Sequence, residues 1–237
     1  MKTEKKDFII CSLIISTLYF LIPIGCNQNT KSASAFYYKE NQLSFCELAL
    51  RFAPRLYIHP KEPYEIMDIV IIIHDQKPII SYHFVWEDDA ISPKSGHNSD
   101  HEIAWIEYDP VSLNVVNVWS IWHRSILNTY DSIEDAKANG QRPAFFVQWG
   151  QHGLLPVGWE KISTAKLSAE LHAHYAIVKT RNLLRFQGDY SDYITFSKIT
   201  DSRKYINPKM IISAEDSNKV LKDMLPYKFR IKKPWPY

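Results

Sequence analysis

The chain has 237 residues, 46% of them apolar and 23% charged, with a formal net charge of +2. These values fit a globular protein with a core of ordinary size, and the 14% aromatic content favours β-structure. The small net charge and the lack of any helix-turn-helix or zinc-finger pattern predict no binding to nucleic acid.

Residues 1–25 have the pattern of a signal peptide. Three lysines among the first six residues precede an uncharged apolar run over 8–24, and Gly25 stands just before Cys26. This ending resembles the lipobox of bacterial lipoproteins, which implies cleavage before Cys26 and a lipid on its thiol. Pro23 replaces the usual Leu, so an uncleaved membrane anchor and ordinary secretion remain alternatives. All three place the protein outside the cytoplasm, either in the cell envelope or secreted.

A polar, small-residue segment over 26–42 predicts a tether, and we expect a single domain over 43–237. Apolar residues at helical spacing predict a helix over 43–52, which Pro54 ends. Cys46 lies in this helix and is the only cysteine of the expected mature domain, so no disulfide framework is predicted. We expect its thiol to be buried and unreactive.

The middle of the chain predicts strands over 66–73, 79–86, 102–108, 113–123 and 144–149. Short strands at this spacing, with aromatic faces, indicate a β-sandwich. Beyond them we expect a helix over 164–178, a strand within 190–199, and a helix that begins with a capping box at Ser213 and ends near Met224. The fold class is therefore mainly β with flanking helices (α+β): a single β-sandwich with a helical C-terminal third.

The segment 96–102, with the sequence GHNSDHE, concentrates metal- and proton-binding side chains just before a strand. Asp88 and Asp89 stand a short loop upstream. Carboxylates this close repel one another unless a cation neutralises them, and carboxylates with an imidazole suit Mg²⁺, Ca²⁺ or Mn²⁺. The sequence therefore predicts a divalent-cation site, and the alternative is a polar loop whose charges are solvated.

The segment 81–109, SYHFVWEDDAISPKSGHNSDHEIAWIEYD, resembles the core of the necrosis- and ethylene-inducing peptide-like (NLP) proteins, in which the heptapeptide GHRHDWE leads into an apolar strand. The matching positions are Gly96, His97, Asp100 and Glu102. Ser99 replaces the second His of that heptapeptide, and His101 replaces its Trp. The stretches ELALRFAPRLYIHPKEPY and RPAFFVQWGQHGLLP are similar to a related group, the fungal vacuolar-protein-sorting-like proteins.

The resemblance implies an NLP-like β-sandwich that acts as a monomer and holds a divalent cation at one end. Carried over by position, the metal ligands are His97, Asp100, Glu102 and either Asp88 or Asp89. Mg²⁺ and Ca²⁺ are the favoured ions, with Mn²⁺ and Zn²⁺ as alternatives.

His123 and His152 each follow a strand, where the loops that build sites leave a sheet. If they converge on the heptapeptide, Zn²⁺ competes for the site and one of them becomes a candidate catalytic general base. If they do not, each is structural. We expect His101 to face away from the site. His172 and His174 are two residues apart on a helix and therefore point to different faces.

Three functions stay open. The first is a non-enzymatic, cation-dependent binder of glycan, glycolipid or lipid head groups, in the extreme a cytolysin, with Trp86, Trp105 and Trp149 as platforms and the membrane as a partner through the N-terminal lipid. The second is a metal-dependent hydrolase built on the same His/Asp/Glu cluster. The third is an envelope lipoprotein with a structural ion. Nucleophile-elbow, Walker, dinucleotide-binding and HExxH motifs are absent from the sequence.

Overall fold

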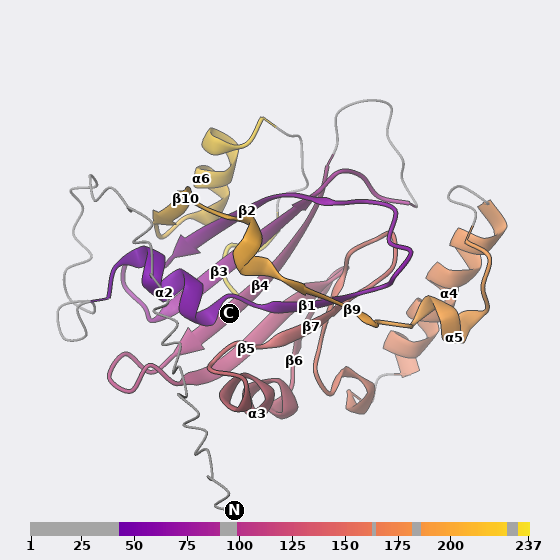
Figure 1. Ribbon diagram of the computed structural model, residues 1–237, viewed down its shortest axis with the longest axis horizontal. Helices are drawn as coiled ribbons and strands as arrows, with labels where there is room; N and C mark the ends of the chain where they lie inside the picture. Colours follow the sequence, from indigo (N-terminus) through magenta and orange to yellow (C-terminus); the bar gives the residue numbers. More distant parts are fainter. Residues whose placement is uncertain (1–42, 91–98, 163–164, 182–185, 227–231) are drawn as a thin grey trace, which may run out of the picture.

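Two β-sheets packed face to face form the body of the computed structural model (Figure 1). It describes residues 43–90, 99–162, 165–181, 186–226 and 232–237. The larger sheet has the strand order β10-β2-β3-β4-β5-β6, and the smaller has the order β8-β7-β1-β9. The strand-rich α+β architecture expected from the sequence is confirmed.

The larger sheet consists of β2 (Ile66–Ile73), β3 (Ile79–Trp86), β4 (Asp100–Tyr108), β5 (Val115–Trp122), β6 (Ser125–Asn128) and β10 (Ile206–Ser213). The smaller sheet consists of β1 (Arg55–Ile58), β7 (Ala144–Val147), β8 (Leu154–Pro156) and β9 (Lys198–Asp201). The α-helices are α2 (Phe45–Phe52), α3 (Tyr130–Ala138), α4 (Ala165–Arg181), α5 (Tyr190–Tyr193) and α6 (Ser217–Met224), and short 3₁₀ turns span Trp159–Lys161 and Ser202–Tyr205.

The side chains of β3 alternate between two apolar layers. Those of Ile80, Tyr82, Phe84 and Trp86 enter the core between the sheets, as their shared face predicted. Ile79 and Val85 join a second layer on the outer face of the larger sheet, which α6 and the chain end cover. Every residue of β3 is buried, as expected for a strand covered on both faces. Each such aliphatic or aromatic side chain contributes about 1.5–3 kcal/mol of burial free energy.

The expected strand within 190–199 is wrong for most of its length. Residues 190–193 form α5, and pairing with β1 begins only at Lys198. The carboxylate of Asp189 accepts hydrogen bonds from the N–H groups of Ser191 and Asp192, which caps this short helix. Asp216, rather than Ser213, caps α6.

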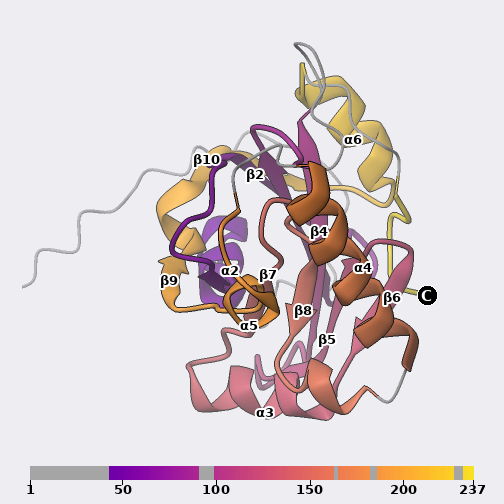
Figure 2. The ribbon, with the colours of Figure 1, turned by 90° about the vertical axis from the view of Figure 1, so that its right-hand side faces the viewer.

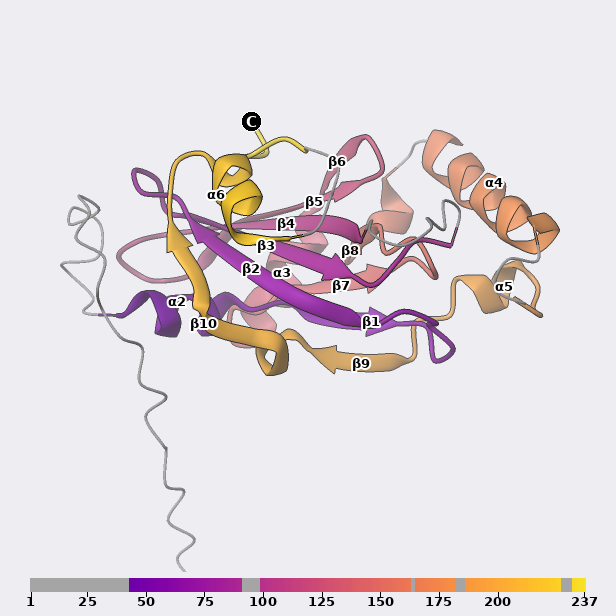
Figure 3. The same cartoon turned by 90° about the horizontal axis from the view of Figure 1, so that it is seen from above.

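One end of the sandwich gathers the segments that matter for function. Trp86, the last residue of β3, pairs with Asp100, the first residue of β4. Helices α4 and α5 lie together at this end (Figures 1 and 3). Figure 2 looks onto it and shows the two helices in front of the strands. The loop between β7 and β8 reaches the same place, because Gly150 O accepts a hydrogen bond from the N–H of Ala90.

No helix in the described part of the chain is long and apolar enough to cross a membrane. The expected signal peptide, the tether and Cys26 lie outside the described residues. Lipidation, the tether and the single domain over 43–237 therefore stay predictions. Cys46, in contrast, lies on α2 and is buried, as expected.

Tyr82 links the larger sheet to α2, because its Oη donates a 2.7 Å hydrogen bond to the carbonyl of Ala49. The side chain is fully buried, so Tyr82→Phe leaves that buried carbonyl oxygen without the bond. We expect the free energy of unfolding to fall by about 1.5 kcal/mol in urea denaturation. Tyr205→Phe removes a hydroxyl from a residue that is 41% exposed and should change stability by less than about 0.5 kcal/mol. Equal losses in the two variants would contradict this account of the link.

Candidate functional site

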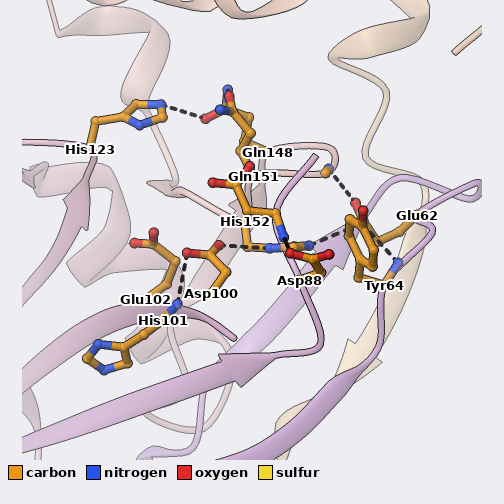
Figure 4. Close-up of polar contacts among 12 residues, drawn as sticks. Glu62, Tyr64, Asp88, Asp100, His101, Glu102, His123, Gln148, Gln151 and His152 are labelled. Carbon is orange, nitrogen blue, oxygen red and sulfur yellow. Dashed lines mark hydrogen bonds and ion pairs between the residues drawn. The ribbon is translucent and has the colours of Figure 1, made fainter. Parts of the chain in front are cut away.

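A buried imidazole bridges two carboxylates at this end of the sandwich (Figure 4). His152 Nδ1 lies 2.9 Å from Asp100 Oδ2, and its Nε2 lies 3.1 Å from Glu62 Oε1. The histidine side chain is fully buried, and that of Glu62 is 3% exposed. His152 therefore joins the β7–β8 loop, the start of β4 and the loop after β1.

The local backbone aims the His152 ring into the protein. Its φ of +57° is in the left-handed region, which is uncommon for residues other than glycine, and its N–H donates to Gln148 O at 2.9 Å. The ring lies parallel to the indole of Trp86, with centroids 4.1 Å apart and 8° between the planes. The tight turn and this stacking together hold the imidazole between its two acidic partners.

Backbone N–H groups fix both carboxylates. Glu62 Oε2 accepts from the N–H of Gly150 at 2.9 Å, and Asp100 Oδ1 accepts from the N–H of His101 at 2.8 Å. Glu62 thus also ties the loop after β1 to the β7–β8 loop. Glu62 lies outside the heptapeptide region and carries no motif of its own, so the sequence does not single it out.

His152 is positively charged at neutral pH. Burial alone would lower its pKa, but the hydrogen bonds and charges of Asp100 and Glu62 outweigh burial and raise the pKa to about 9. Both ring nitrogens then carry a proton and donate. Of the two alternatives left open for His152, the structure shows contact with the heptapeptide through Asp100, but as an imidazolium His152 has no lone pair with which to accept a proton.

Glu102 is a second buried carboxylate beside Asp100. Its Oε1 lies 2.8 Å from the ammonium of Lys232, and its side chain is 7% exposed. Oε2 is buried and has no hydrogen-bond partner among the described residues. Burial raises the pKa of Glu102 to about 8, against the effect of Lys232. Figure 4 shows the carboxylates of Asp100 and Glu102 on the same side of β4.

His101 points to the opposite side of β4, as the alternation predicted (Figure 4). Its Nε2 is 3.0 Å from His83 Nδ1, and His83 Nε2 is 2.9 Å from Ser81 Oγ. Burial, with a smaller effect of Lys232, lowers the pKa of His83 to about 3. His83 is therefore a neutral structural residue at physiological pH.

Gln148 connects His123 to this end of the sandwich. Its Oε1 accepts from Trp122 Nε1 at 2.9 Å and from His123 Nε2 at 3.0 Å, and its Nε2 donates to Gln151 and Tyr193 at 2.8 and 2.9 Å. His123 is thus linked through Gln148 to the loop that carries His152, whereas His152 itself contacts Asp100.

His123 is held as a neutral imidazole. It stacks on His174, with ring centroids 4.1 Å apart and 7° between the planes. Burial and the nearby His174 lower the pKa of His123 to about 4. His172 instead stacks on Tyr190, so His172 and His174 face different ways, as expected from their spacing.

The acidic loop after β3 lies near His152. Burial and then the charges of Asp88 and Asp89 raise the pKa of Tyr64 to about 12, and the Tyr64 ring meets the His152 ring edge-on at 5.9 Å. Asp88 Oδ1 accepts a 2.8 Å hydrogen bond from the N–H of Asp89. Negative charge from three segments therefore accumulates around one imidazolium.

Within the residues that the structure describes, no group of three or more His, Cys, Asp or Glu side chains is arranged to hold a metal ion. His97 lies outside them, so the ligand set of His97, Asp100, Glu102 and Asp88 or Asp89 stays a prediction. The unpartnered Glu102 Oε2 fits such a set, because a buried carboxylate oxygen needs a positive partner.

The expected tryptophan platforms are wrong. Trp86, Trp105 and Trp149 are 1%, 0% and 2% exposed, so none presents a free face to a ligand. All three belong to apolar core clusters, where buried aromatic side chains stabilise the fold.

No protein-family model and no curated protein matches the chain. A solved structure described as "Toxin fold as basis for microbial attack and plant defense" matches with a TM-score of 0.31 and 16% sequence identity. The match covers 45% of this chain and 66% of that one, slightly under two thirds of its length. A similarity this low carries no argument about function, and the NLP resemblance continues to depend on the residues quoted from the sequence.

The raised pKa of His152 predicts a specific pH dependence. Its imidazolium stabilises the fold fully below pH 6.5, the usual pKa of histidine, and this contribution is lost as pH rises through about 9. The stability difference between the wild-type protein and His152→Gln should therefore be largest near pH 6 and shrink by about 3 kcal/mol by pH 10. Denaturant titrations at several pH values measure it.

His74 offers the control, because burial lowers its pKa below the usual value for histidine. His74→Gln should leave the slope of stability between pH 6.5 and 9 close to that of the wild-type protein. If the free energy of unfolding of the wild-type protein changes with pH over this range just as that of His152→Gln does, His152 is neutral in the folded protein.

Proposed function

We propose that this protein is a non-enzymatic binding protein that holds a divalent cation at the acidic end of its sandwich and uses it to bind glycan or lipid head groups. One observation carries the proposal: Glu102 is buried beside Asp100 and has one carboxylate oxygen without a partner among the described residues. Burial raises the pKa of Glu102 to about 8, so this group is largely protonated at neutral pH in the absence of a metal, and a bound cation would lower that pKa and stabilise the charged carboxylate.

The proposed ligands are Asp100, Glu102, His97 and a carboxylate of Asp88 or Asp89. Oxygen donors with one imidazole suit Mg²⁺ or Ca²⁺ best, with Mn²⁺ and Zn²⁺ as competitors. The cation would supply positive charge and coordination positions for sugar hydroxyls or for a phosphate or carboxylate. The chain's own part is to hold these side chains rigidly, which the backbone bonds to Asp100 support.

The state of the two histidines favours binding over hydrolysis. His152 is protonated and donates from both nitrogens, so it is no general base at neutral pH. The pKa of His123, about 4, makes it a weak base, and its Nε2 is bonded to Gln148. The metal-dependent hydrolase therefore lacks an effective base among the candidates that the sequence suggested.

We further propose that the protein acts outside the cytoplasm, displayed on a membrane through a lipid on Cys26. The basic, apolar and small-residue pattern of residues 1–26 supports this. An anchored protein would present its acidic site to head groups of the same or a facing membrane.

Calorimetric titration of the metal-free protein tests the cation site. We expect one site for Ca²⁺ or Mg²⁺, weakened by about tenfold or more in Glu102→Gln because glutamine cannot lose a proton to become an anionic ligand when the cation binds. The control is Glu134→Gln on α3, where the exposed side chain of Glu134 pairs with Lys137. Equal affinity in Glu102→Gln and the control would remove Glu102 from the site, and no binding by any of the three proteins would refute the proposal.

Sedimentation with vesicles tests the ligand class. Phosphatidylcholine vesicles that contain a glycolipid should carry the protein, without its N-terminal segment 1–42, into the pellet with Ca²⁺ and not with EDTA. Glu102→Gln should stay in the supernatant in both conditions, because it lacks the cation. Binding that ignores EDTA would contradict the proposed role of the cation, and binding that needs no sugar head group would assign the ligand to the lipid head groups.

A further inference from the structure

The last six residues, 232–237, form a strap across the outer face of the larger sheet. Trp235 is 6% exposed within the apolar layer that α6 covers. Trp105 Nε1 donates to Pro234 O at 3.0 Å, and Trp235 Nε1 donates to Glu215 O at 2.6 Å. Aromatic burial and these bonds hold the strap by contacts that do not involve the acidic site.

At its first residue the strap reaches the acidic site. The ammonium of Lys232 lies 2.8 Å from Glu102 Oε1 and also donates to the carbonyl of His101. Both partners of the ion pair are largely buried, with side-chain exposures of 13% and 7%. The positive charge that Glu102 now contacts therefore comes from the chain itself, from a residue far along the sequence.

We propose that Lys232 is an internal competitor of the divalent cation, so that the cation binds by displacing the ammonium from Glu102. This inference rests on the proposed function. Two cations on one buried carboxylate repel each other, because the buried surroundings screen their charges poorly. By linkage, whatever holds Lys232 on Glu102 weakens cation binding, and the bound cation weakens the hold on Lys232 by the same factor.

The strap's other contacts make this exchange feasible. Trp235 and Pro234 keep it on the sheet when the lysine side chain swings away, so displacement needs no unfolding of the chain end. The long, flexible lysine stem also lets the ammonium reach water from its present position, where it is already partly exposed. The contact between Lys232 and Glu102 thus lowers the affinity of the site for the cation.

The test compares Lys232→Gln with the matched control Lys233→Gln, whose side chain is the exposed neighbour on the same strap. Calorimetric titration with Ca²⁺ and with Mn²⁺ should give about tenfold tighter binding for Lys232→Gln, within the range typical of coupled sites, and wild-type affinity for Lys233→Gln. Trp235→Ala keeps the lysine but loosens its anchor, and should tighten binding by a smaller factor.

The outcomes separate this inference from the proposed function. If the wild-type protein binds the cation, and Lys232→Gln and Trp235→Ala leave its affinity unchanged or weaken it, Lys232 is no competitor. The proposed cation site is then unaffected. No binding by the wild-type protein or by any variant overturns both. Circular dichroism shows whether each variant is folded. If Lys232→Gln does not fold, the cation affinity of Trp235→Ala tests the inference.

Discussion

Buried negative charge at one end of the sandwich requires compensating positive charge, and the geometry of the site follows from this constraint. His152 stands 2.9 and 3.1 Å from Asp100 and Glu62, and Lys232 stands 2.8 Å from Glu102. An unpaired buried carboxylate costs several kcal/mol, so these pairs fasten distant parts of the chain to β4 and to one another. The loop after β1, the β7–β8 loop and the chain end are thereby joined where β3 and β4 meet.

The chain neutralises this end with its own cations and leaves the neutralisation incomplete. The imidazolium uses both of its protons, whereas Glu102 keeps one oxygen without a partner among the described residues. An external cation would complete the set and would have to contend with Lys232. If a cation binds as proposed, the site would respond to cation concentration, because the two forms would differ by the exchange of one charge for another.

The sequence predicts the parts of this structure that depend on local patterns. Runs of β-branched residues and alternating faces give β2 and β3 with their observed ends, and the heptapeptide places Asp100 and Glu102 on one face of β4. Contacts between distant segments are beyond such patterns: Glu62 and His152 are 90 residues apart. The strand expected within 190–199 fails for another reason, since the cap at Asp189 favours a helix locally over the β-forming side chains.

A titration of the His152 ring by NMR tests the central claim most directly. The Cε1–H shifts of histidines, assigned with His152→Gln, report the protonation of each ring as pH is raised from 5 to 10. A charge-compensating imidazolium predicts that His152 stays protonated at pH 7 and titrates near its raised pKa of about 9. A His152 that titrates at or below 6.5, the ordinary value for histidine, would contradict the account.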